Sequence, residues 1–208
     1  MSEDKRFVKY QEQLESLEGG IDRIDVSNVY AWELSRINTN EAHVMAIEAL
    51  NAAKEHDYDL GIANAQRTIA QCYWLKGDYT STINHGNNAY DIYQKINDRK
   101  GEAEVLNLFG GVYSDMNDLH NSKINFQKAL NIRKEIGDDL GVVKSMNSIG
   151  DLMMKQQQYR EALKIFDECL SIDHDSAMYR GIVLYNIAEA NYYLENYALS
   201  TVQIMHCQ

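Results

Sequence analysis

Two asparagines, Asn107 and Asn147, occupy matching places in two similar stretches, each in the middle of a helical hydrophobic pattern. Asparagine is a poor helix former, because its side chain competes with the backbone for hydrogen bonds. A carboxamide can, however, donate to a carbonyl and accept from an N–H group of a peptide backbone at once. The pair therefore predicts a face that holds an extended peptide without reading its side chains. Two alternatives stay open: a row of solvated polar residues, or hydrogen bonds between neighbouring helices.

Other arrangements that could carry chemistry are missing from the sequence. The six histidines fall in different predicted helices and linkers, and none has the spacing of a metal site. The chain has no glycine-rich phosphate-binding motif and no serine-hydrolase motif. Its cysteines, Cys72, Cys169 and Cys207, are odd in number and contain no C-x-x-C pair, which argues against a disulfide scaffold or a zinc site. We therefore expect a non-enzymatic protein with no catalytic residue, no metal and no cofactor.

Composition narrows the classes of partner. The 208 residues carry a formal net charge of −11, which disfavours binding to nucleic acid and to anionic membrane surfaces. The longest apolar stretches have about five residues, whereas a membrane-spanning helix needs about 20. The N-terminus lacks the apolar region of a signal peptide. We expect a cytoplasmic protein without membrane insertion, unless the chain is a fragment from which a targeting segment was removed.

The asparagines belong to an internal repeat. Gly61, Gly101 and Gly141 recur with a 40-residue period, and in the four copies after the first, three small residues recur at spacings of 12 and 7, as at Gly110, Ser122 and Ala129. Small side chains let two helices joined by a short turn pack closely. In the turn Lys76-Gly77-Asp78-Tyr79, Gly77 can take a positive φ and Asp78 can cap the next helix. The sequence also contains no proline. It predicts an all-α solenoid of about five helix-turn-helix repeats.

A separate helical pattern precedes the solenoid, in residues 1–20. Phe7, Tyr10, Leu14 and Leu17 form one apolar stripe, which would either cover the open end of the solenoid or pair with a second copy of the chain. The solenoid itself covers residues 21–208. Its repeats span about residues 27–59, 61–100, 101–140, 141–175 and 177–208.

The first and last repeats depart from the pattern. In the first, Tyr30 is too large for the small position, so we expect the helix to be slipped toward Ala31, with Trp32, Leu34 and Ile37 facing inward. In the last, the linker is two positions shorter, so the small residue that corresponds to Gly150 is expected at Ala188, and the chain ends partway through the second helix. We expect this end to continue or to be covered by a partner or a second copy.

These spacings resemble the tetratricopeptide repeat (TPR) family over residues 27–208. The resemblance rests on a small residue, a tyrosine, a polar turn and then a small–aromatic–small triplet. The residues that carry it are Gly110, Tyr113, Ser122, Phe126 and Ala129 in the third repeat, and Gly150, Tyr159, Ala162, Phe166 and Cys169 in the fourth. The chain departs from the family pattern by its 40-residue period and its lack of proline. In this it resembles the repeats of bacterial signalling proteins, peptide-pheromone receptors and animal spindle-orientation scaffolds.

The resemblance implies a right-handed α-solenoid, a function and a binding face. In TPR proteins the first helix of each repeat lines a concave groove that binds a protein or peptide partner. The residues that would line it here are Asn64, Arg67, Gln71, Trp74, Asn107, Lys144, Asn147, Asp151, Tyr185, Glu189 and Tyr192. Arg67, Asn107 and Asn147 would hold a backbone, and Trp74, Tyr185 and Tyr192 would be apolar anchors.

Two further expectations follow from the family. Some members of the family bind the C-terminal acid of chaperones through a set of side chains called the two-carboxylate clamp. The chain matches this clamp only in part, because Leu108 and Ser148 stand where an asparagine and a basic residue are expected. We therefore do not expect chaperone binding. The alternative function is that of a regulatory, self-associating region of a larger signalling protein, with a histidine kinase or diguanylate cyclase beyond residue 208. Such a region would form a homodimer through the N-terminal helix or the uncapped C-terminal end.

Overall fold

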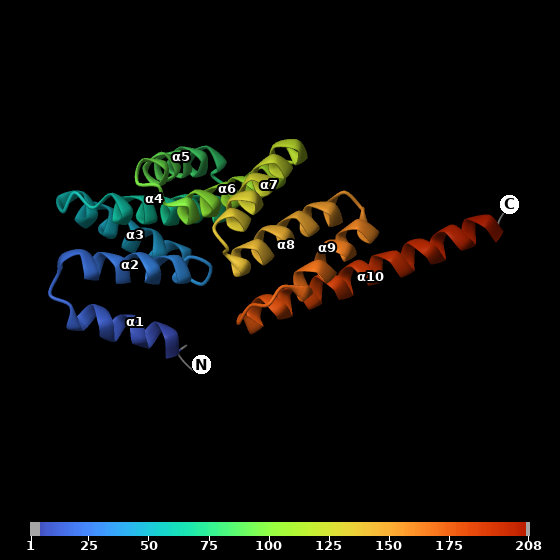
Figure 1. Ribbon diagram of the computed structural model, residues 1–208, viewed down its shortest axis with the longest axis horizontal. Coiled ribbons are helices and arrows are strands. Elements are labelled where there is room, and N and C mark those ends of the chain that lie inside the picture. The colour runs from blue at the N-terminus through green and yellow to red at the C-terminus, as the bar shows by residue number, and fades with distance from the viewer. Residues whose placement is uncertain (1–4, 207–208) are drawn as a thin grey trace. The chain divides into compact units, whose positions relative to one another are not determined.

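The computed structural model describes the backbone of residues 5–206 and the side chains of residues 7–195. Within that part it contains ten helices and no strand (Figure 1). The helices are α1 (Lys5–Ser16), α2 (Gly20–Leu34), α3 (Thr39–Glu55), α4 (Asp59–Leu75), α5 (Tyr79–Lys95), α6 (Arg99–Asp115), α7 (Leu119–Glu135), α8 (Asp139–Lys155), α9 (Tyr159–Ser171) and α10 (Ala177–His206). The all-helical fold class that the sequence predicts is confirmed.

The helices are spaced with great regularity. From α3 to α9 each new helix begins at a constant interval, which is half of the 40-residue period, and each helix from α3 to α8 has 17 residues. One 40-residue period of the sequence therefore corresponds to two helices of equal length, each followed by a turn of equal length. We call α2, α4, α6, α8 and α10, the first helix of each pair, the A-helices.

Each turn in this series uses one residue in the left-handed backbone region. These residues are Asp57, Gly77, Asn97, Asn117, Gly137 and Gln157, with φ from 48° to 78°. Where the residue that follows is an aspartate, as in four of these turns, its side chain caps the next helix. Asp78, for example, donates its backbone N–H to the Tyr73 carbonyl at 3.0 Å, and its carboxylate accepts from the Ser81 N–H at 3.0 Å. The roles predicted for Gly77 and Asp78 are confirmed.

The small residues lie where two helices approach most closely. A Cβ atom on Gly110 would collide with the Phe126 ring, and one on Gly150 would collide with the Phe166 ring. The Ser122 hydroxyl donates to the Gly110 carbonyl at 2.8 Å, so the 12-residue spacing brings these two residues into direct contact. The recurring small positions are therefore packing positions.

The chain divides into two compact units, and each is described by itself. Unit 1 runs up to Leu108 and unit 2 begins at Phe109, so that the boundary falls inside α6. Each unit has its own core. Unit 1 packs small and branched side chains from α2, α3 and α4, including Ala31, Ala46, Ala49, Ala65, Leu50 and Ile69. Unit 2 packs larger ones, including Phe126, Val143, Met146, Ile149, Phe166 and Val183.

The cysteines behave as small core residues. Cys72 and Cys169 are both free and buried. Burial raises the pKa of the Cys72 thiol to about 11 and that of the Cys169 thiol to about 12, so that both stay protonated and unreactive at neutral pH. Cys207 lies outside the described residues.

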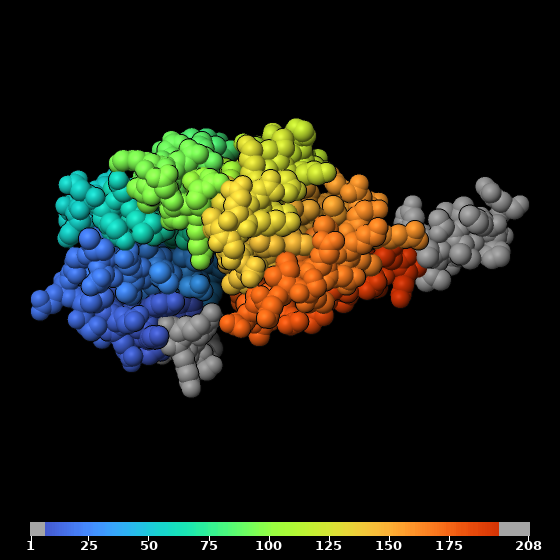
Figure 2. Space-filling model, viewed as in Figure 1, coloured from blue at the N-terminus to red at the C-terminus, as the bar shows by residue number. Residues whose placement is uncertain are grey.

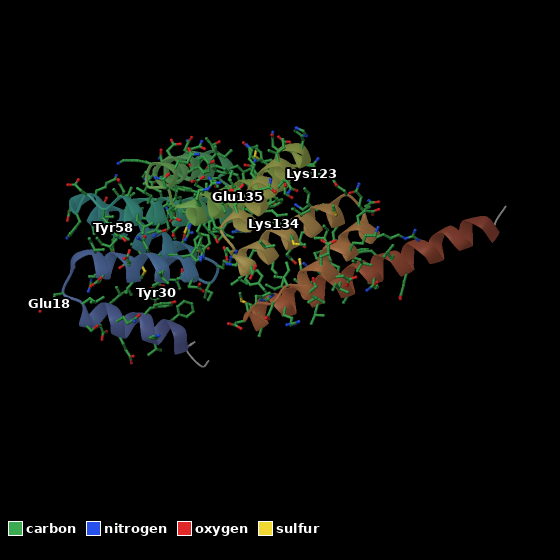
Figure 3. The ribbon with its side chains drawn as sticks, viewed as in Figure 1. Glu18, Tyr30, Tyr58, Lys123, Lys134 and Glu135 are labelled. Atoms are coloured by element: carbon green, nitrogen blue, oxygen red, sulfur yellow. The ribbon has the colours of Figure 1, made fainter. Side chains whose placement is uncertain are left out.

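Helix α1 lies against α2 in unit 1, and its predicted apolar stripe is in contact there. Phe7, Tyr10 and Leu14 pack beside Tyr30 and Leu34. Tyr30 points from α2 toward α1 (Figure 3), and the ring of Tyr10 is stacked on it with centroids 5.5 Å apart. In the space-filling view, the side chains of these two helices form one continuous surface (Figure 2). Phe7, Tyr10 and Leu14 of the stripe are thus in contact with α2 of the same chain.

The first repeat confirms part of its prediction. Ala31 and Leu34 are buried and Trp32 is half-buried, but Ile37 is 67% exposed. The expectation that Ile37 faces inward is wrong. The reason is that α2 ends at Leu34, so Ile37 lies in the turn before Asn38, whose side chain accepts from the Glu41 N–H and caps α3.

The fifth repeat differs from its prediction in two ways. Residues 177–206 form one continuous helix, α10, in place of two helices separated by a turn. At the expected turn the sequence reads Leu-Glu-Asn-Tyr, and the backbone runs through these residues as helix without a change of direction. The second difference is in register. Ala190, one full period after Gly150, is fully buried, whereas Ala188 is exposed. Sequence spacing misplaced this position because both residues are alanine.

Candidate partner-binding faces

The predicted site residues lie on four A-helices and in both units. Asn64, Arg67, Gln71 and Trp74 are on α4, and Asn107 is on α6, all in unit 1; Lys144, Asn147 and Asp151 on α8 and Tyr185, Glu189 and Tyr192 on α10 are in unit 2. Their spacings of three and four residues place those of one helix along a single face. Asn107 is half-buried.

On α4, Asn64 takes part in a hydrogen bond between helices. Its Oδ1 atom accepts from the Tyr93 hydroxyl of α5 at 2.7 Å. Burial raises the pKa of Tyr93 to about 12, so this phenol remains a donor at any physiological pH. Gln71, two turns further along α4, is only 3% exposed. Asn64 is therefore held by α5 and Gln71 is buried, while Trp74, further along the same face, is half-buried.

Arg67 lies between these two amides along α4 and is stacked on Trp32 of α2. The centre of its guanidinium group is 4.3 Å from the centroid of the Trp32 ring. The guanidinium Nε atom is buried and has no hydrogen-bond acceptor. Sequence analysis placed Trp32 in the core and missed this pairing, since the separation of the two residues along the chain does not follow the 40-residue period.

In unit 2, a polar network joins α8 to α10. Asn186 on α10 donates from Nδ2 to the Asn147 Oδ1 atom at 2.9 Å and to the Asp151 Oδ1 atom at 2.8 Å. Asn147 in turn donates to the second carboxylate oxygen of Asp151 at 3.1 Å. Asn147 and Asn186 are each 8% exposed. For Asn147, the alternative of hydrogen bonds between neighbouring helices is thus what the structure shows.

The carboxyl group of Asp151 has an altered acidity. Its side chain is exposed as a whole, but the carboxyl group is held between α8 and α10. Burial there, with the negative charge of Glu189 as a smaller cause, raises the pKa of Asp151 to about 6, while Lys155 acts in the opposite direction. Lys155 also donates to the Ser114 hydroxyl at 2.8 Å, which fixes its ammonium group nearby.

Asn186 was missed by sequence analysis because of the register error in α10. The assumed 38-residue offset from Asn147 led to Tyr185, which is 68% exposed, whereas the neighbouring Asn186 is the residue in contact with α8. Among the side chains of this helix that the structure describes, up to residue 195, the buried ones are Val183, Asn186 and Ala190. Their spacing of three and four residues was the signal that could have found the register.

The exposed residues of α10 include both predicted tyrosine anchors. Tyr185 is 68% exposed and Tyr192 is 64% exposed. Glu189 lies between them along the same helical face and is half-buried. On α8, the Lys144 ammonium group sits 5.2 Å from the ring centroid of Tyr179, near the start of α10.

Two histidines that the sequence left unconnected meet in unit 1. The Tyr73 ring is stacked on His85 with centroids 5.3 Å apart, and its edge contact with His43 has a centroid distance of 5.0 Å. The Nδ1 atom of His85 is 2.6 Å from the Gln66 Oε1 atom, and the His43 Nε2 atom is buried without a partner. Burial lowers the pKa of both imidazoles. Their separation along the chain differs from the repeat period, so the period did not indicate their contact.

Two other kinds of site are missing from the described part of the chain. There, no group of three or more histidine, cysteine or acidic side chains is placed to bind a metal ion. Across residues 5–206, no helix has both the length and the apolarity needed to cross a bilayer.

Comparison with known proteins places these helices in a family. The tetratricopeptide repeat model matches residues 61–135 and again residues 101–175, which together make up more than half of the chain. No curated protein matches the chain.

Several solved structures share the fold. BtubC (BKLC) from P. vanneervenii aligns with a TM-score of 0.61 and 16% identity, covering 80% of this chain and 72% of that one. The apo form of RapI aligns with a TM-score of 0.63 and 17% identity, covering 96% of this chain and 63% of RapI. This chain therefore spans less than two thirds of the length of RapI. A putative kinesin light chain from Podosopora anserina, with nearly identical TPR-like repeats, aligns with a TM-score of 0.61 and 10% identity. The alignment covers 88% of this chain and 92% of that one.

At such low identity these structural likenesses show the fold alone. The family model rests on the residues of the repeats themselves. Its matches cover the region in which helices begin at a constant interval and small residues pack against aromatic rings. The chain belongs to the tetratricopeptide repeat family.

Proposed function

We propose that this chain is a non-enzymatic interaction module that binds a peptide or helical segment of a protein partner on its A-helix faces. TPR modules are in general scaffolds for protein interaction. The observation that carries the proposal is on α10, where Tyr185 and Tyr192, 68% and 64% exposed, lie along one face with Glu189. Glu189 is close enough to Asp151 for its charge to affect the carboxyl group.

This combination suits a binding face for physical reasons. A tyrosine buries a large apolar ring on binding and has a hydroxyl to orient it, and tyrosines are enriched among the residues that dominate binding energy. The neighbouring polar groups are already fixed by the Asn147–Asp151–Asn186 network. Groups that are ordered before binding lose less entropy when a partner arrives.

The role proposed for Asn147 changes with its contacts. Because Asn147 is 8% exposed and bonded to both Asn186 and Asp151, it holds the Asp151 carboxylate in place. The direct contacts to a partner in unit 2 then come from Asp151, Glu189 and the two exposed tyrosines.

An unbiased peptide-display selection against the whole chain tests the proposal. We expect selected peptides to bind the unaltered protein and to lose about tenfold or more in affinity, roughly 1.4 kcal/mol, to a Tyr185→Ala/Tyr192→Ala variant. Leu184→Ala is the matched control, because Leu184 is on the same helix and is 51% exposed. Equal losses in both variants, or a failure to select any peptide, would overturn the proposal.

A second candidate function is self-association of a regulatory region, and one observation favours it. Met178, Ile182, Tyr185 and Tyr192 form an apolar stripe on α10, with exposures of 62%, 37%, 68% and 64%. Sedimentation velocity over a rising concentration series decides between the candidates. A dimer that Ile182→Asp dissociates would support self-association, and a strictly monomeric chain would remove it.

A further inference from the structure

Helix α1 is attached to unit 1 less firmly than the helices that follow it. None of the side chains that the structure describes in α1, residues 7–16, is buried, and the apolar residues Phe7, Tyr10 and Leu14 are half-buried. By comparison α3, the other neighbour of α2 along the chain, buries five of its side chains. The contact between α1 and α2 is therefore confined to one side of α1.

The connection between α1 and α2 also lacks the turn chemistry found further along the chain. Four later turns end in an aspartate whose side chain caps the next helix, whereas α2 begins after Gly19, which has no side chain to do so. Instead, Arg23 of α2 donates from its Nη1 atom to the backbone carbonyls of Leu14 and Leu17, the second at 2.7 Å. These hydrogen bonds are exposed, so water can replace them at little cost in free energy.

The surface of α2 beneath α1 is, in contrast, strongly apolar. Tyr30 and Leu34 are 4% and 6% exposed and belong to one buried cluster. The Tyr10 ring is stacked on Tyr30, and the centroid of the Phe7 ring is 5.6 Å from that of Tyr30. A chain from which α1 had simply detached would expose these side chains to water, which is unfavourable. The surface therefore needs a helix with this pattern of side chains, but that helix need not come from the same chain.

We propose that two copies of the chain exchange α1, so that α1 of each copy packs on α2 of the other. We call this the exchanged arrangement, and the packing of α1 on its own α2 the closed arrangement. A second copy is the fitting occupant because its α1 brings the same Phe7, Tyr10 and Leu14 contacts. Exchange of an identical element is a low-cost route to a dimer, since each contact that is broken is made again. The inference does not depend on the proposed binding of a peptide.

Gly20 is the residue whose backbone separates the two arrangements. Its φ is 79°, in the left-handed region that residues with a side chain rarely adopt. Gly19 has a φ of 163°, an extended conformation that any residue can adopt. A Cβ atom at either position would have nothing within 4 Å. Alanine at Gly20 alone therefore opposes the closed arrangement, while alanine at either position favours a connection that straightens into helix.

Exchange of α1 is a different mode of self-association from pairing through α10. It takes place in unit 1, whereas the apolar stripe of α10 that includes Ile182 is in unit 2. In the exchanged arrangement, each copy completes the apolar cluster of the other. Two interaction modules are then joined in one particle, and linked sites bind a partner with two matching segments more tightly than a single site does.

Sedimentation velocity of the full chain measures the exchange. We expect a monomer–dimer equilibrium in which Gly20→Ala lowers the dimer dissociation constant by about tenfold or more. Gly19→Ala is the matched control and should lower it by a smaller factor, because the closed arrangement stays unstrained. Gly20→Asn should have the least effect, since asparagine tolerates positive φ. Equal constants for the two alanine variants, or a Gly20→Ala chain that stays monomeric throughout a rising concentration series, would overturn the inference.

Nuclear magnetic resonance identifies the helix that crosses between copies. An equimolar mixture of isotope-labelled and unlabelled Gly20→Ala chains forms mixed dimers. We expect isotope-filtered Overhauser contacts between the Tyr10 ring of one copy and the Tyr30 ring of the other, because these rings have centroids 5.5 Å apart when α1 is packed on α2. A dimer without this contact would be held together by another surface, and the inference would fall.

Substitutions on two helices separate this dimer from one formed through α10. In the Gly20→Ala chain, Tyr10→Asp removes the ring that stacks on Tyr30 and should abolish the dimer, whereas Ile182→Asp should leave it unchanged. Lys9→Asp, at an exposed position of α1, is the matched control for the added negative charge. The opposite pattern, a dimer lost with Ile182→Asp and kept with Tyr10→Asp, would rule out exchange of α1 and support pairing through α10.

Discussion

Asn186 on α10 donates a hydrogen bond to the Oδ1 atom of Asn147 on α8 at 2.9 Å, and the same amide group donates to the Asp151 carboxylate. One side chain of the last helix thus fixes two polar side chains of the preceding A-helix. The asparagine that first indicated a peptide-binding face is part of the packing between α8 and α10, and it shapes that face through Asp151.

Removing this amide should destabilise unit 2. Asn186→Ala leaves two acceptors without their donor, and we expect a loss of about 1–3 kcal/mol in the free energy of unfolding. Chemical denaturation measures it, with the exposed Asn191→Ala on the same helix as control. If the two variants lose the same stability, the network does not join α8 to α10 energetically. Asn147→Ala and Asn186→Ala should also be less than additive, because they remove the same bond.

The acidity of Asp151 should follow the charges beside it. Glu189→Gln removes a negative charge and should lower the pKa of Asp151 from about 6, whereas Lys155→Met removes the opposing positive charge and should raise it. A carbon-detected titration of the Asp151 carboxyl group measures both. Shifts in the same direction would contradict the assignment of these neighbours.

The stability of the chain should reflect the same raised pKa. Between the ordinary pKa of about 3.9 and about 6, the folded state binds more protons at Asp151 than the unfolded state does. This stabilising contribution is therefore complete below the ordinary pKa and is lost as the pH rises through about 6. Solvent screens a partly exposed group, so we expect a modest change. It should shrink in the Glu189→Gln variant.

His43 and His85 in unit 1 should make the stability depend on pH in the opposite direction. Burial lowers the pKa of His43 and His85, with Lys76 and His85 adding to the effect at His43 and Asp78 opposing it at His85. Below the ordinary value of about 6.5, the unfolded state then binds more protons, so the stability present above that pH is lost as the pH falls. A His43→Gln/His85→Gln variant should flatten this slope in denaturation experiments. His56→Gln, at an exposed position, is the matched control.

The repeats show what the sequence could predict and what it could not. Gly77, Asp78, Gly110 and Gly150 were assigned correctly, because turn chemistry and close packing restrict the residue type at each position. The same residue types are required at the same positions of each repeat, so one sequence shows the pattern several times.

The contacts that were missed do not recur. Trp32 and Arg67 meet across neighbouring A-helices at a separation unrelated to the period. His43 on α3 and His85 on α5 both contact Tyr73 of α4, and their separation does not match the period either. Asn186 was missed for a different reason, since alanines at positions 188 and 190 made two registers of α10 look equally good. Spacing predicts which helix face is packed, but contacts between individual side chains depend on the relative rotation of the helices.

Two glycines in unit 2 separate packing from helix propensity. Gly150 in α8 faces the fully buried Phe166 ring, with which a new Cβ atom would collide, whereas Gly181 in α10 has nothing within 4 Å of the same position. Alanine is favoured over glycine in a helix by about 1 kcal/mol. Gly181→Ala should therefore stabilise the chain, by at most that amount. Gly150→Ala should destabilise it, since overpacking costs about 1–3 kcal/mol and outweighs the gain.

A compensating change tests the cause of the Gly150 effect. Phe166→Leu alone should destabilise the core, but in combination with Gly150→Ala it makes room for the new methyl group. The double variant should therefore be more stable than the sum of the single changes predicts, by about 0.5–3 kcal/mol. Thermal and denaturant unfolding of the four proteins of the cycle measure this coupling. Strict additivity would mean that Gly150 is needed for a reason other than the ring that packs against it.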